Sequence, residues 1–414
     1  MLRYSFPALA LRALRGHKRW PRVLRSADPK PAYDAVIIGG GGHGLATAYF
    51  LAKEHGMRRI AVLEKGAIGH GNSGRNTQVV RSDYYHLPSS KFFDRSLQLY
   101  EGLSRELNFN IMLSQRGKIN LAHSPHEMEM QRRATNAIRM NGVDAEMLSV
   151  DDLRRLEPAL NFNGRYPIEG GSVQWRGGIA RHDAGVWAFA RGAGALGVDI
   201  VQGCEVTGFQ IENGRVAGVE TTRGRIAAPR VCMAVAGHSS ELARKAGISL
   251  PLNSLALQAM VTEPVKPMLN HVLMSAVVHV YVSQSDRGEV VIAGGADTYH
   301  SYAQRGGMAV MEATAQAAVE LFPFLGRLRI MRQWAGIVDI SPDTSPVMGL
   351  TPVNGLYVSA GWGTGGYKAI PAGGETMAWT IANDRPHELI TAFSLGRFAE
   401  GALVDEGAAS GVAH

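Results

Sequence analysis

Residues 33–44 read YDAVIIGGGGHG, and this stretch decides how the rest of the chain is organised. The β-branched run Val36–Ile38 favours a buried strand, which the four following glycines end abruptly. From Leu45 to Leu51 the chain is apolar again, now at helical spacing. A strand, a tight glycine turn and a helix in this order are typical of a dinucleotide-binding unit, because the start of such a helix binds a pyrophosphate.

The spacing within this stretch predicts separate roles for its glycines. We expect Gly39 to permit the turn, Gly41 to let the backbone approach the pyrophosphate, and Gly44 to let the helix pack on the strand. Residues 60–63 predict a second strand. Glu64 follows Gly44 by twenty residues, where a carboxylate accepts hydrogen bonds from the adenosine ribose. A glycine turn in an ordinary α/β domain is the alternative.

Composition limits the other possibilities. The 414 residues suffice for two domains or one composite, and the net charge is +7. Residues 1–30 hold eight Lys or Arg against one acid, Asp28, and the remainder is close to neutral, so we expect no nucleic-acid partner. For this basic segment, a targeting peptide, a solvated tail and an arm laid on an acidic partner all stay open. The arm would bury Leu9, Leu11, Leu14 and Trp20.

Membrane and redox signals point to a soluble, reducing setting. No apolar run approaches the ~20 residues that span a bilayer, so we expect no membrane partner. Cys204 and Cys232 lie in strand-like runs and are interpreted as buried thiols rather than a disulfide. We therefore expect a cytoplasmic protein.

The remaining pattern predicts a mixed α/β fold, in which a Rossmann-like FAD-binding domain is interleaved with a mixed-sheet substrate domain. Residues 198–237 read as a strand, a hairpin turning at Asn213-Gly214, and a strand that returns to the cofactor. Residues 255–300 and 327–340 are rich in β-branched runs and predict the wall of a substrate cavity. The predicted parts are a basic N-terminal arm (1–32), the FAD-binding domain (33–120, 183–250 and 328–390), a substrate and interface domain (121–182 and 251–327) and a C-terminal tail (391–414).

A second glycine loop, residues 361–366, lies between a predicted strand and a helix that follows Pro371. A flat isoalloxazine needs backbone at its edges, and a helix N-terminus stabilises negative charge on it. Taken alone, the loop is equally consistent with a tight crossing between a strand and a helix. Together the two loops predict a flavin, with these cofactor contacts: Gly39, Gly41, Gly42, Gly44, Glu64, Lys65, Asn72, Arg75, Asn76, Thr77, Val206, Gly237, Gly361, Gly363, Thr364, Gly365, Gly366 and Lys368.

Two cations are candidates for the catalytic residues. Arg81 and Lys368 would clamp a substrate carboxylate, with Arg81 bidentate and Lys368 acting as a point charge. The alternative is two ordinary surface cations.

His182 stands at a predicted helix start between Arg181 and Asp183, and taken alone it is structural or solvated. Further possible cavity-lining residues are Tyr84, Tyr85, His279, Tyr281 and Trp334. No metal site is predicted.

At this point longer motifs become informative. The chain resembles the β subunits of heterotetrameric sarcosine oxidase, within the D-amino-acid-oxidase-like flavoprotein superfamily. The resemblance runs from about Arg3 to His414 and is carried by YDAVIIGGGGHGLATAYFLAKEHG, FNIMLSQRGKINLAH, GGIARHDAG, RQWAGIVD and GWGTGGYKA.

The resemblance implies an enzyme that oxidatively demethylates sarcosine to glycine at a non-covalent FAD. It implies a second flavin, FMN, attached covalently to His182 at the interface with a large α subunit, and further γ and δ subunits. Electrons would pass from FMN to O2, giving H2O2, and tetrahydrofolate would take the formaldehyde equivalent. Arg81 and Lys368 fall where relatives anchor the substrate carboxylate. Residues 331–348 contain no cysteine that could tether FAD.

Some positions depart from the family pattern, among them Ala335, Ile340, Met348 and residues 370–372. They flank the cavity segments, so another N-methylated or secondary amino acid, such as proline, is an alternative substrate. A dehydrogenase that reduces a quinone or a partner protein is a second reading. A non-catalytic FAD-binding scaffold is a third. The resemblance favours the arm interpretation of residues 1–32.

Overall fold

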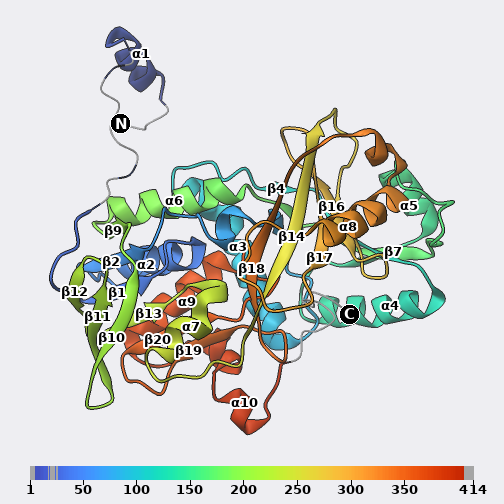
Figure 1. The fold of residues 1–414 in the computed structure, drawn as a ribbon. Coiled ribbons are helices and arrows are strands. Elements are labelled where there is room, and N and C mark those ends of the chain that lie inside the picture. Colours follow the sequence, from blue (N-terminus) through green and yellow to red (C-terminus); the bar gives the residue numbers. More distant parts are fainter. Residues whose placement is uncertain (1–4, 17, 19–23, 25–26, 405–414) are drawn as a thin grey trace.

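The computed structural model describes residues 5–16, 18, 24 and 27–404. Among these residues, the strands form a six-stranded sheet, an eight-stranded sheet and two three-stranded sheets (Figure 1). The two larger sheets lie side by side and draw their strands alternately from the chain. The predicted mixed α/β fold with two interleaved sheets is therefore confirmed.

The six-stranded sheet is built around β1 and is parallel except at one edge. Its order is β19-β20-β13-β1-β2-β9, and β19 runs antiparallel to β20. The predicted strands and the return of the chain to β1 after the hairpin are confirmed. Its strands are β1 (Ala35–Ile38), β2 (Ile60–Glu64), β9 (Asp199–Gln202), β13 (Val231–Met233), β19 (Val347–Leu350) and β20 (Leu356–Ala360).

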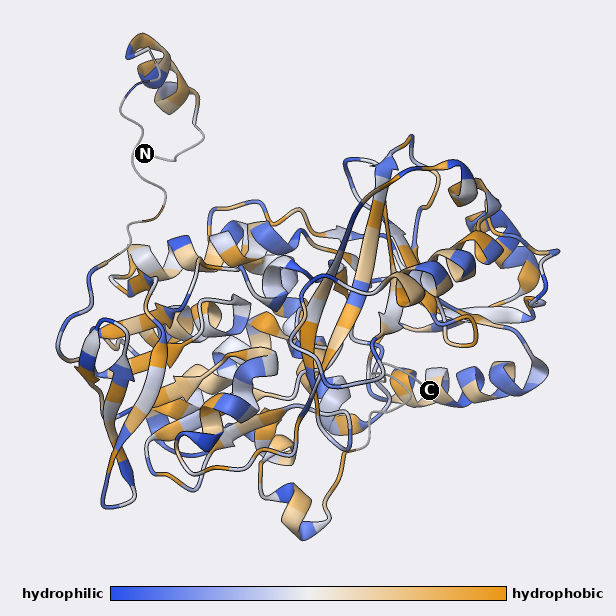
Figure 2. Ribbon diagram, in the orientation of Figure 1, coloured by the Kyte–Doolittle hydropathy of each residue, from blue (hydrophilic) through white to orange (hydrophobic). Residues whose placement is uncertain are grey.

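Strand β1 is apolar throughout because both faces of this sheet are covered. Successive side chains of a strand point to opposite faces. Ala35 and Ile37 pack into the core beneath the helices, and Val36 and Ile38 pack into the core on the other face. Figure 2 shows the resulting apolar interior. The helices on the first face are α2 (Gly42–Glu54), α6 (His182–Ala195) and α9 (Ile370–Asn383), joined by α3 (Leu87–Glu106).

The other face is covered by a small antiparallel sheet. Its hairpin turns at Asn213 and Gly214, which both have positive φ, as predicted for this dipeptide. The strands are β10 (Val206–Glu212), β11 (Arg215–Thr221) and β12 (Gly224–Ala227). The short elements nearby are η2 (Ala236–His238) and α7 (Ser239–Arg244).

The eight-stranded sheet has the order β18-β14-β17-β16-β15-β5-β7-β6. Helices α5 and α8 cover one of its faces through a core that includes Leu153 and Leu321. The elements are β5 (Lys118–Ala122), α4 (Pro125–Met140), β6 (Glu146–Leu148), α5 (Val150–Leu156), β7 (Gly170–Gln174), β14 (Asn253–Pro264), β15 (Val272–Ser275), β16 (Val280–Gln284), β17 (Glu289–Ala296), α8 (Met308–Leu321), η3 (Pro323–Arg327) and β18 (Ile330–Ile340).

Strand β18 crosses a boundary drawn from the sequence. It lies within residues 328–390, which were expected to belong to the FAD-binding domain, yet it pairs with β14 in the eight-stranded sheet. Its last residues reach the six-stranded sheet, since Asp339 hydrogen-bonds the backbone after β20. Similarly, β5 spans the predicted boundary between residues 120 and 121, and it pairs with β15 and β7 in the eight-stranded sheet. The third small sheet joins β3 (Val79–Val80), β8 (Gly178–Ile179) and β4 (Ser114–Gln115).

The C-terminal residues as far as 404 pack on the body. Arg397 is buried and forms an ion pair with Asp343, and the backbone N–H of Val404 donates to the same carboxylate. The elements are η4 (Glu388–Phe393) and α10 (Arg397–Glu400). Helix α1 (Phe6–Leu14) instead stands apart from the body (Figure 1). Trp20, predicted to contact a partner, lies outside the described residues.

Two further expectations concern the cysteines and the bilayer. Cys204 and Cys232 are buried free thiols, as predicted, and burial raises the pKa of Cys232 to about 12. In the part of the chain that the structure describes, no helix is both long and apolar enough to cross a bilayer.

Candidate active site

A cavity of about 1100 Å³ lies where the two large sheets meet. Both glycine loops line it, together with the inner face of the eight-stranded sheet. Its size exceeds the upper range of ordinary small-ligand pockets, ~1,000 Å³, and suits a dinucleotide with a substrate beside it.

The first glycine turn leaves no space for side chains on its inner side. Gly39 has a φ of +110°, and a Cβ there would lie 2.3 Å from the carbonyl oxygen of Ala234. A Cβ on Gly44 would lie 2.0 Å from the carbonyl oxygen of Gly39. Helix α2 begins after Gly41, which has no side chain to cap it, and the N–H of Gly42 donates to Ser73 Oγ at 2.9 Å in the cavity wall. This cradle fits a pyrophosphate.

Glu64 ends β2 at the rim of the same cavity. Its two carboxylate oxygens accept hydrogen bonds from the backbone N–H groups of Gly40 and Gly66, each at 2.8 Å. The carboxylate is therefore held in place beside the glycine turn. This is the position from which an acid reaches a ribose hydroxyl.

The second glycine loop is tied to β18. The buried carboxylate of Asp339 accepts a hydrogen bond from the N–H of Gly361 at 2.6 Å. Burial raises the pKa of Asp339 to about 6, although the N–H bonds oppose this shift. His43, from the first loop, stacks on Trp362 with ring centroids 4.3 Å apart. Its Nε2–H donates to the carbonyl of Gly366 at 2.8 Å, which joins the two loops.

Burial lowers the pKa of His43 to about 4, so its ring is neutral at pH 7. Its Nδ1 is buried and has no hydrogen-bond partner among the described residues. A neutral imidazole with an unused acceptor therefore lies between the loops, inside the cavity wall.

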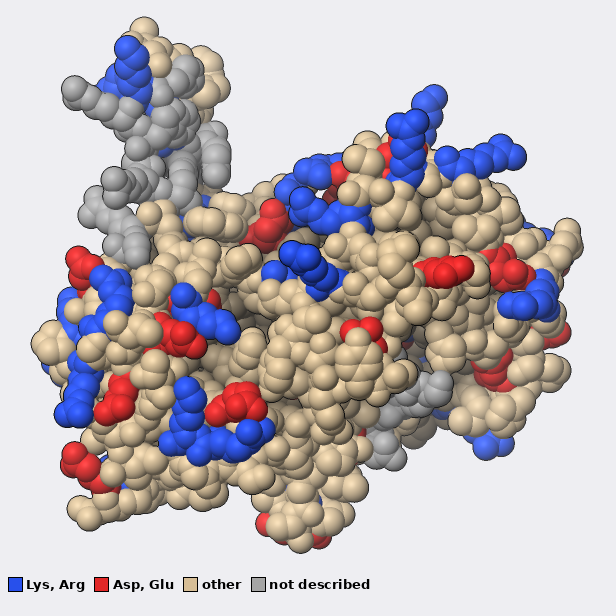
Figure 3. Space-filling model, viewed as in Figure 1, with Lys and Arg blue, Asp and Glu red and all other residues tan. Residues whose placement is uncertain are grey.

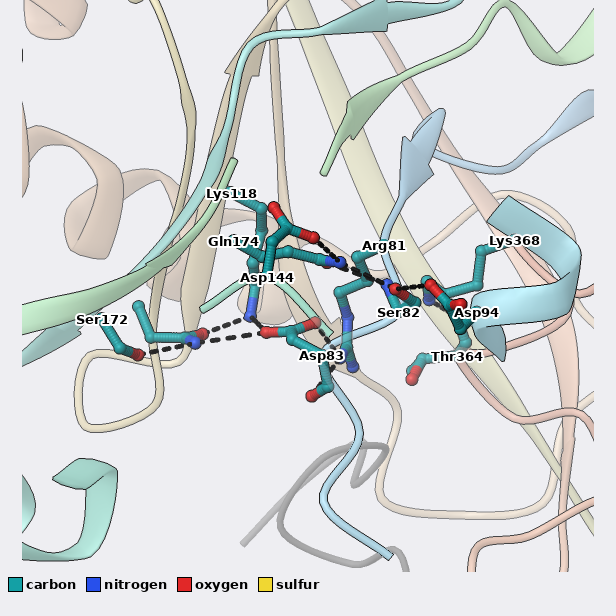
Figure 4. Close-up of polar contacts among 11 residues, drawn as sticks. Arg81, Ser82, Asp83, Asp94, Lys118, Asp144, Ser172, Gln174, Thr364 and Lys368 are labelled. Carbon is teal, nitrogen blue, oxygen red and sulfur yellow. Dashed lines mark hydrogen bonds and ion pairs between the residues drawn. The ribbon is translucent and has the colours of Figure 1, made fainter. Parts of the chain in front are cut away.

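A cluster of charged side chains lines the cavity beyond the loops (Figure 4). Arg81, Asp83, Lys118 and Lys368 are all less than one-tenth exposed. Asp83 binds Arg81 through Oδ1 at 2.6 Å and Lys118 through Oδ2 at 2.8 Å. The guanidinium of Arg81 also stacks on Tyr84, with its Cζ 4.5 Å from the ring centroid. Lys368 Nζ donates to the carbonyl of Thr364 at 3.0 Å.

The cluster controls the ionisation of its members. Burial would raise the pKa of Asp83, but the charges of Arg81 and Lys118 hold it below its usual range. Burial lowers the pKa of Lys118 to about 8, against the attraction of Asp83. Burial, helped by the charge of Arg81, also lowers the pKa of Lys368 well below its ordinary value. An anion bound here would stabilise the charged form of Lys368.

His182 lies at the first residue of α6 and does not line this cavity among the described residues. Helix α6 packs on the Asn72–Gly74 turn, and residues of that turn do line the cavity. Burial lowers the pKa of His182, while Asp183 opposes the shift. The ring is half-buried, and its Nδ1 has no hydrogen-bond partner in the described structure. Arg181 and Asp183 form a two-bond ion pair beside it.

Most of the predicted contacts meet in this cavity. Its lining includes Gly39, Gly41, Gly42, Glu64, Lys65, Asn72, Arg75, Asn76, Thr77, Arg81, Val206, Gly237, Gly363, Thr364, Gly366 and Lys368. Gly44, Gly361 and Gly365 lie behind the loops, where they permit close packing. Of the aromatic candidates, Tyr85, His279 and Tyr281 line the cavity, while Tyr84 stacks on Phe93 in the core and Trp334 donates to the carbonyl of Arg75.

Sequence reasoning missed Asp83, Lys118, His43 and Asp339. The sequence did give an indication for Lys118, because this residue is a lone cation in the otherwise strand-like run KINLA. In β5, Ile119 faces the core, so Lys118 and Asn120 face the cavity. The pairing of Lys118 with Asp83 left no signal, because it depends on two segments that are distant in the chain.

Comparisons with known proteins identify the family of this chain. Residues 34–379 match the family described as FAD dependent oxidoreductase. The chain is 48% identical to the sarcosine oxidase subunit beta of Rhodobacter capsulatus, over 100% of both chains. It is 50% identical to that of Rhizobium meliloti, over 98% of each chain.

Solved structures share the fold. L-proline dehydrogenase from P. horikoshii superposes with a TM-score of 0.85 at 26% identity, covering 91% of this chain and 100% of that one. Glycine oxidase from Geobacillus kaustophilus gives a TM-score of 0.81 at 23% identity, covering 89% and 99%. The second likeness is one of fold alone.

Proposed function

Since this chain belongs to the FAD-dependent oxidoreductase family, alongside the β subunits of sarcosine oxidase, we propose that it oxidises sarcosine within a multi-subunit flavoprotein amine oxidase. The observation that carries the proposal is the convergence of the buried Arg81 and Lys368 side chains in one cavity with both glycine loops. Such a cavity offers a dinucleotide cradle and an anion site side by side.

The residues of the chain divide this work. The first glycine turn and Glu64 would hold the adenosine and pyrophosphate part of FAD, and the Gly361–Gly366 loop would meet the flavin ring. Arg81 and Lys368 would bind the substrate carboxylate and so fix the N-methyl group. When bound, FAD would supply a hydride acceptor for the N-methyl carbon, and FMN would supply a path for the electrons to O2, which would become H2O2. The other products would be glycine and a formaldehyde equivalent that tetrahydrofolate takes up.

The same cations favour a neutral substrate amine. Arg81, Lys118 and Lys368 lie around the place where the substrate would bind, and positive charge disfavours an ammonium group. A neutral amine already has its lone pair, so no dedicated general base is needed. The partners proposed are an α subunit with smaller γ and δ subunits, and the proposed location is the cytoplasm.

A spectral titration tests the function. The chain is produced with its α, γ and δ partners, FAD and FMN, and sarcosine is added without oxygen. We expect the flavin absorbance to bleach, and hydrogen peroxide to form once oxygen is admitted. A complex that sarcosine neither bleaches nor drives to make peroxide would defeat the proposal. A flavin that no amine reduces would instead make the chain an FAD-binding scaffold.

A second candidate is a dehydrogenase of another secondary amino acid. The likeness to L-proline dehydrogenase favours it. L-proline in the same titration, with oxygen consumption compared against dye reduction, separates the two. Faster bleaching by proline, with electrons passing to dye rather than oxygen, would select this alternative.

His182 is proposed to carry the covalent FMN. Its half-buried ring has an Nδ1 with no hydrogen-bond partner among the described residues, and it begins α6, which packs on the Asn72–Gly74 segment at the cavity wall. We expect His182→Ala to keep FAD but to lose the flavin that stays with the protein after acid precipitation. His126→Ala, an exposed position on α4, is the control and should keep both flavins. A covalent flavin retained by His182→Ala would place the attachment elsewhere.

A further inference from the structure

Lys118 is a buried cation that the clamp formed by Arg81 and Lys368 does not explain. It is 3% exposed and begins β5, opposite Gln174 of β7. Its Nζ donates to Asp83 at 2.8 Å and also to Asn120. Lysine is rarely buried so completely unless its charge has a use or a partner.

The segment that carries Arg81 is anchored to the same strands. Ser82 N–H donates to Gln174 Oε1 at 2.9 Å, and Gln174 Nε2 donates to Ser82 Oγ at 2.7 Å. Arg81 and Asp83 flank this reciprocal pair, so β7 sets their position. Figure 4 shows Arg81 and Lys118 on either side of Asp83.

Asp83 has one clear benefit and one clear cost. It holds the guanidinium of Arg81 at 2.6 Å, over the ring of Tyr84, which fixes the direction of the Arg81 donors. An Arg–Asp pair alone, however, has no net charge, and its carboxylate would repel the carboxylate of a substrate. Lys118 occupies the second oxygen of Asp83 and returns a net charge of +1 to the group Arg81, Asp83 and Lys118.

We propose that Lys118 is a positioning residue of the substrate site. Lys118 neutralises Asp83, so that Asp83 can orient the guanidinium of Arg81 while Arg81 still attracts the substrate carboxylate. This inference rests on the proposed function, because it takes an amino-acid carboxylate as the ligand. It differs from a purely structural ion pair in one respect. What matters is the balance of charge across the three residues, rather than the presence of a lysine.

Binding of a substrate-like acid measures this balance directly. Methoxyacetate has the carboxylate of sarcosine and an ether oxygen in place of the amine, and its binding is followed by the absorbance of FAD in the full complex. Methoxyacetamide is the uncharged companion probe. We expect Lys118→Met to raise the Kd for methoxyacetate about tenfold or more, which corresponds to the loss of one buried charge interaction, and to leave weak methoxyacetamide binding unchanged.

Two further variants separate charge from structure. Lys118→Arg keeps the charge, and should stay within about threefold of the natural chain. The double variant Asp83→Asn with Lys118→Met removes one negative and one positive charge, leaving the net +1, and an Asn oxygen can still accept from Arg81. We expect it to bind methoxyacetate within about threefold of the natural chain and to recover the KM for sarcosine that Lys118→Met loses, with kcat little changed throughout.

The outcomes are distinct. Unchanged methoxyacetate binding in Lys118→Met, or a double variant as weak as Lys118→Met, would overturn the proposal. FAD content and thermal midpoint are measured for each variant as checks on folding. If Lys118→Met does not fold, the double variant and the single variant Asp83→Asn test the proposal. Asp83→Asn should bind methoxyacetate at least as tightly as the natural chain. If sarcosine bleaches the natural chain but the Kd for methoxyacetate does not depend on the charge at residue 118, only this inference fails. If sarcosine does not bleach the natural chain, the proposed function fails.

Discussion

Gly44 shows how single atoms limit the cofactor turn. The space where its Cβ would lie is occupied by the carbonyl oxygen of Gly39, 2.0 Å away. Both groups are backbone, so no side-chain rotation can relieve the clash. Other residues of the site are equally constrained, since Arg81 is held by Asp83 and by the ring of Tyr84.

We therefore expect Gly44→Ala to shift α2 away from β1. Overpacking of this kind costs about 1–3 kcal/mol of unfolding free energy, and the shift should also lower FAD content. Gly102→Ala is the matched control, because Gly102 lies in α3 with open space around it and should gain about 0.5–1 kcal/mol. Urea unfolding and the FAD released on heating measure both effects. Normal FAD content and stability in Gly44→Ala would contradict the packing argument.

Strand β18 shows how one element serves both sheets. It pairs with β14, and at its end Asp339 accepts a hydrogen bond from the N–H of Gly361. That contact holds the second glycine loop at the cavity. Asp339 is 2% exposed, and this burial disfavours the charged form of its carboxyl group.

This burial predicts a pH dependence. The folded-state pKa of Asp339 is about 6, against the usual 3.8 of an aspartate, so between those limits the folded protein holds a proton that the unfolded chain has lost. The contribution of Asp339 to stability therefore falls as pH rises from about 4 to about 6, and stays low above that. Asp339→Asn keeps an oxygen for Gly361 and removes the dependence.

The measurement is the urea midpoint of the apoprotein at several pH values. We expect the stability of Asp339→Asn, relative to the natural chain, to increase over that window and then to level off. Asp151→Asn, an exposed position on α5, makes the same chemical change at the surface and serves as the control. A difference between Asp339→Asn and the natural chain that is constant with pH would show that Asp339 does not titrate as its burial requires.

At the level of the whole molecule, the cavity lies between the six-stranded and the eight-stranded sheet. Both sheets line it, so a bound dinucleotide would contact both and hold them together. On the half of the face in Figure 3 that belongs to the six-stranded sheet, acidic and basic side chains are intermixed. Helix α1 is set apart from this body, and its apolar side chains are exposed: Phe6 by 81%, Leu9 by 58% and Leu14 by 87%.

If α1 is an arm for a partner subunit, its deletion should separate folding from assembly. We expect a chain lacking residues 1–16 to keep FAD and its thermal midpoint, because α1 stands apart from the body, but to co-purify less with the α subunit. Leu9→Asp in the full chain should weaken assembly in the same way, and Arg15→Gln is the control at a neighbouring polar position. Undiminished assembly of the shortened chain would remove the arm interpretation.

Short local patterns in the sequence were sufficient to predict several secondary-structure elements and several candidate site residues. The order of strand, glycine turn and helix and the Asn213-Gly214 hairpin follow from interactions between neighbouring residues, which any chain with these residues would make. The two glycine loops and the pair Arg81 and Lys368 could be named as candidates for the same reason, since residue type and spacing limit their chemistry.

Only the tertiary structure decided which distant segments meet. It placed β18 in the eight-stranded sheet and brought Lys118 to Asp83, 35 residues away. It also positioned His182 behind the Asn72–Gly74 turn instead of inside the cavity. Strand pairing and the burial of charge depend on the register of the whole sheet, and register is set by the packing of many residues together, which no short stretch of sequence contains.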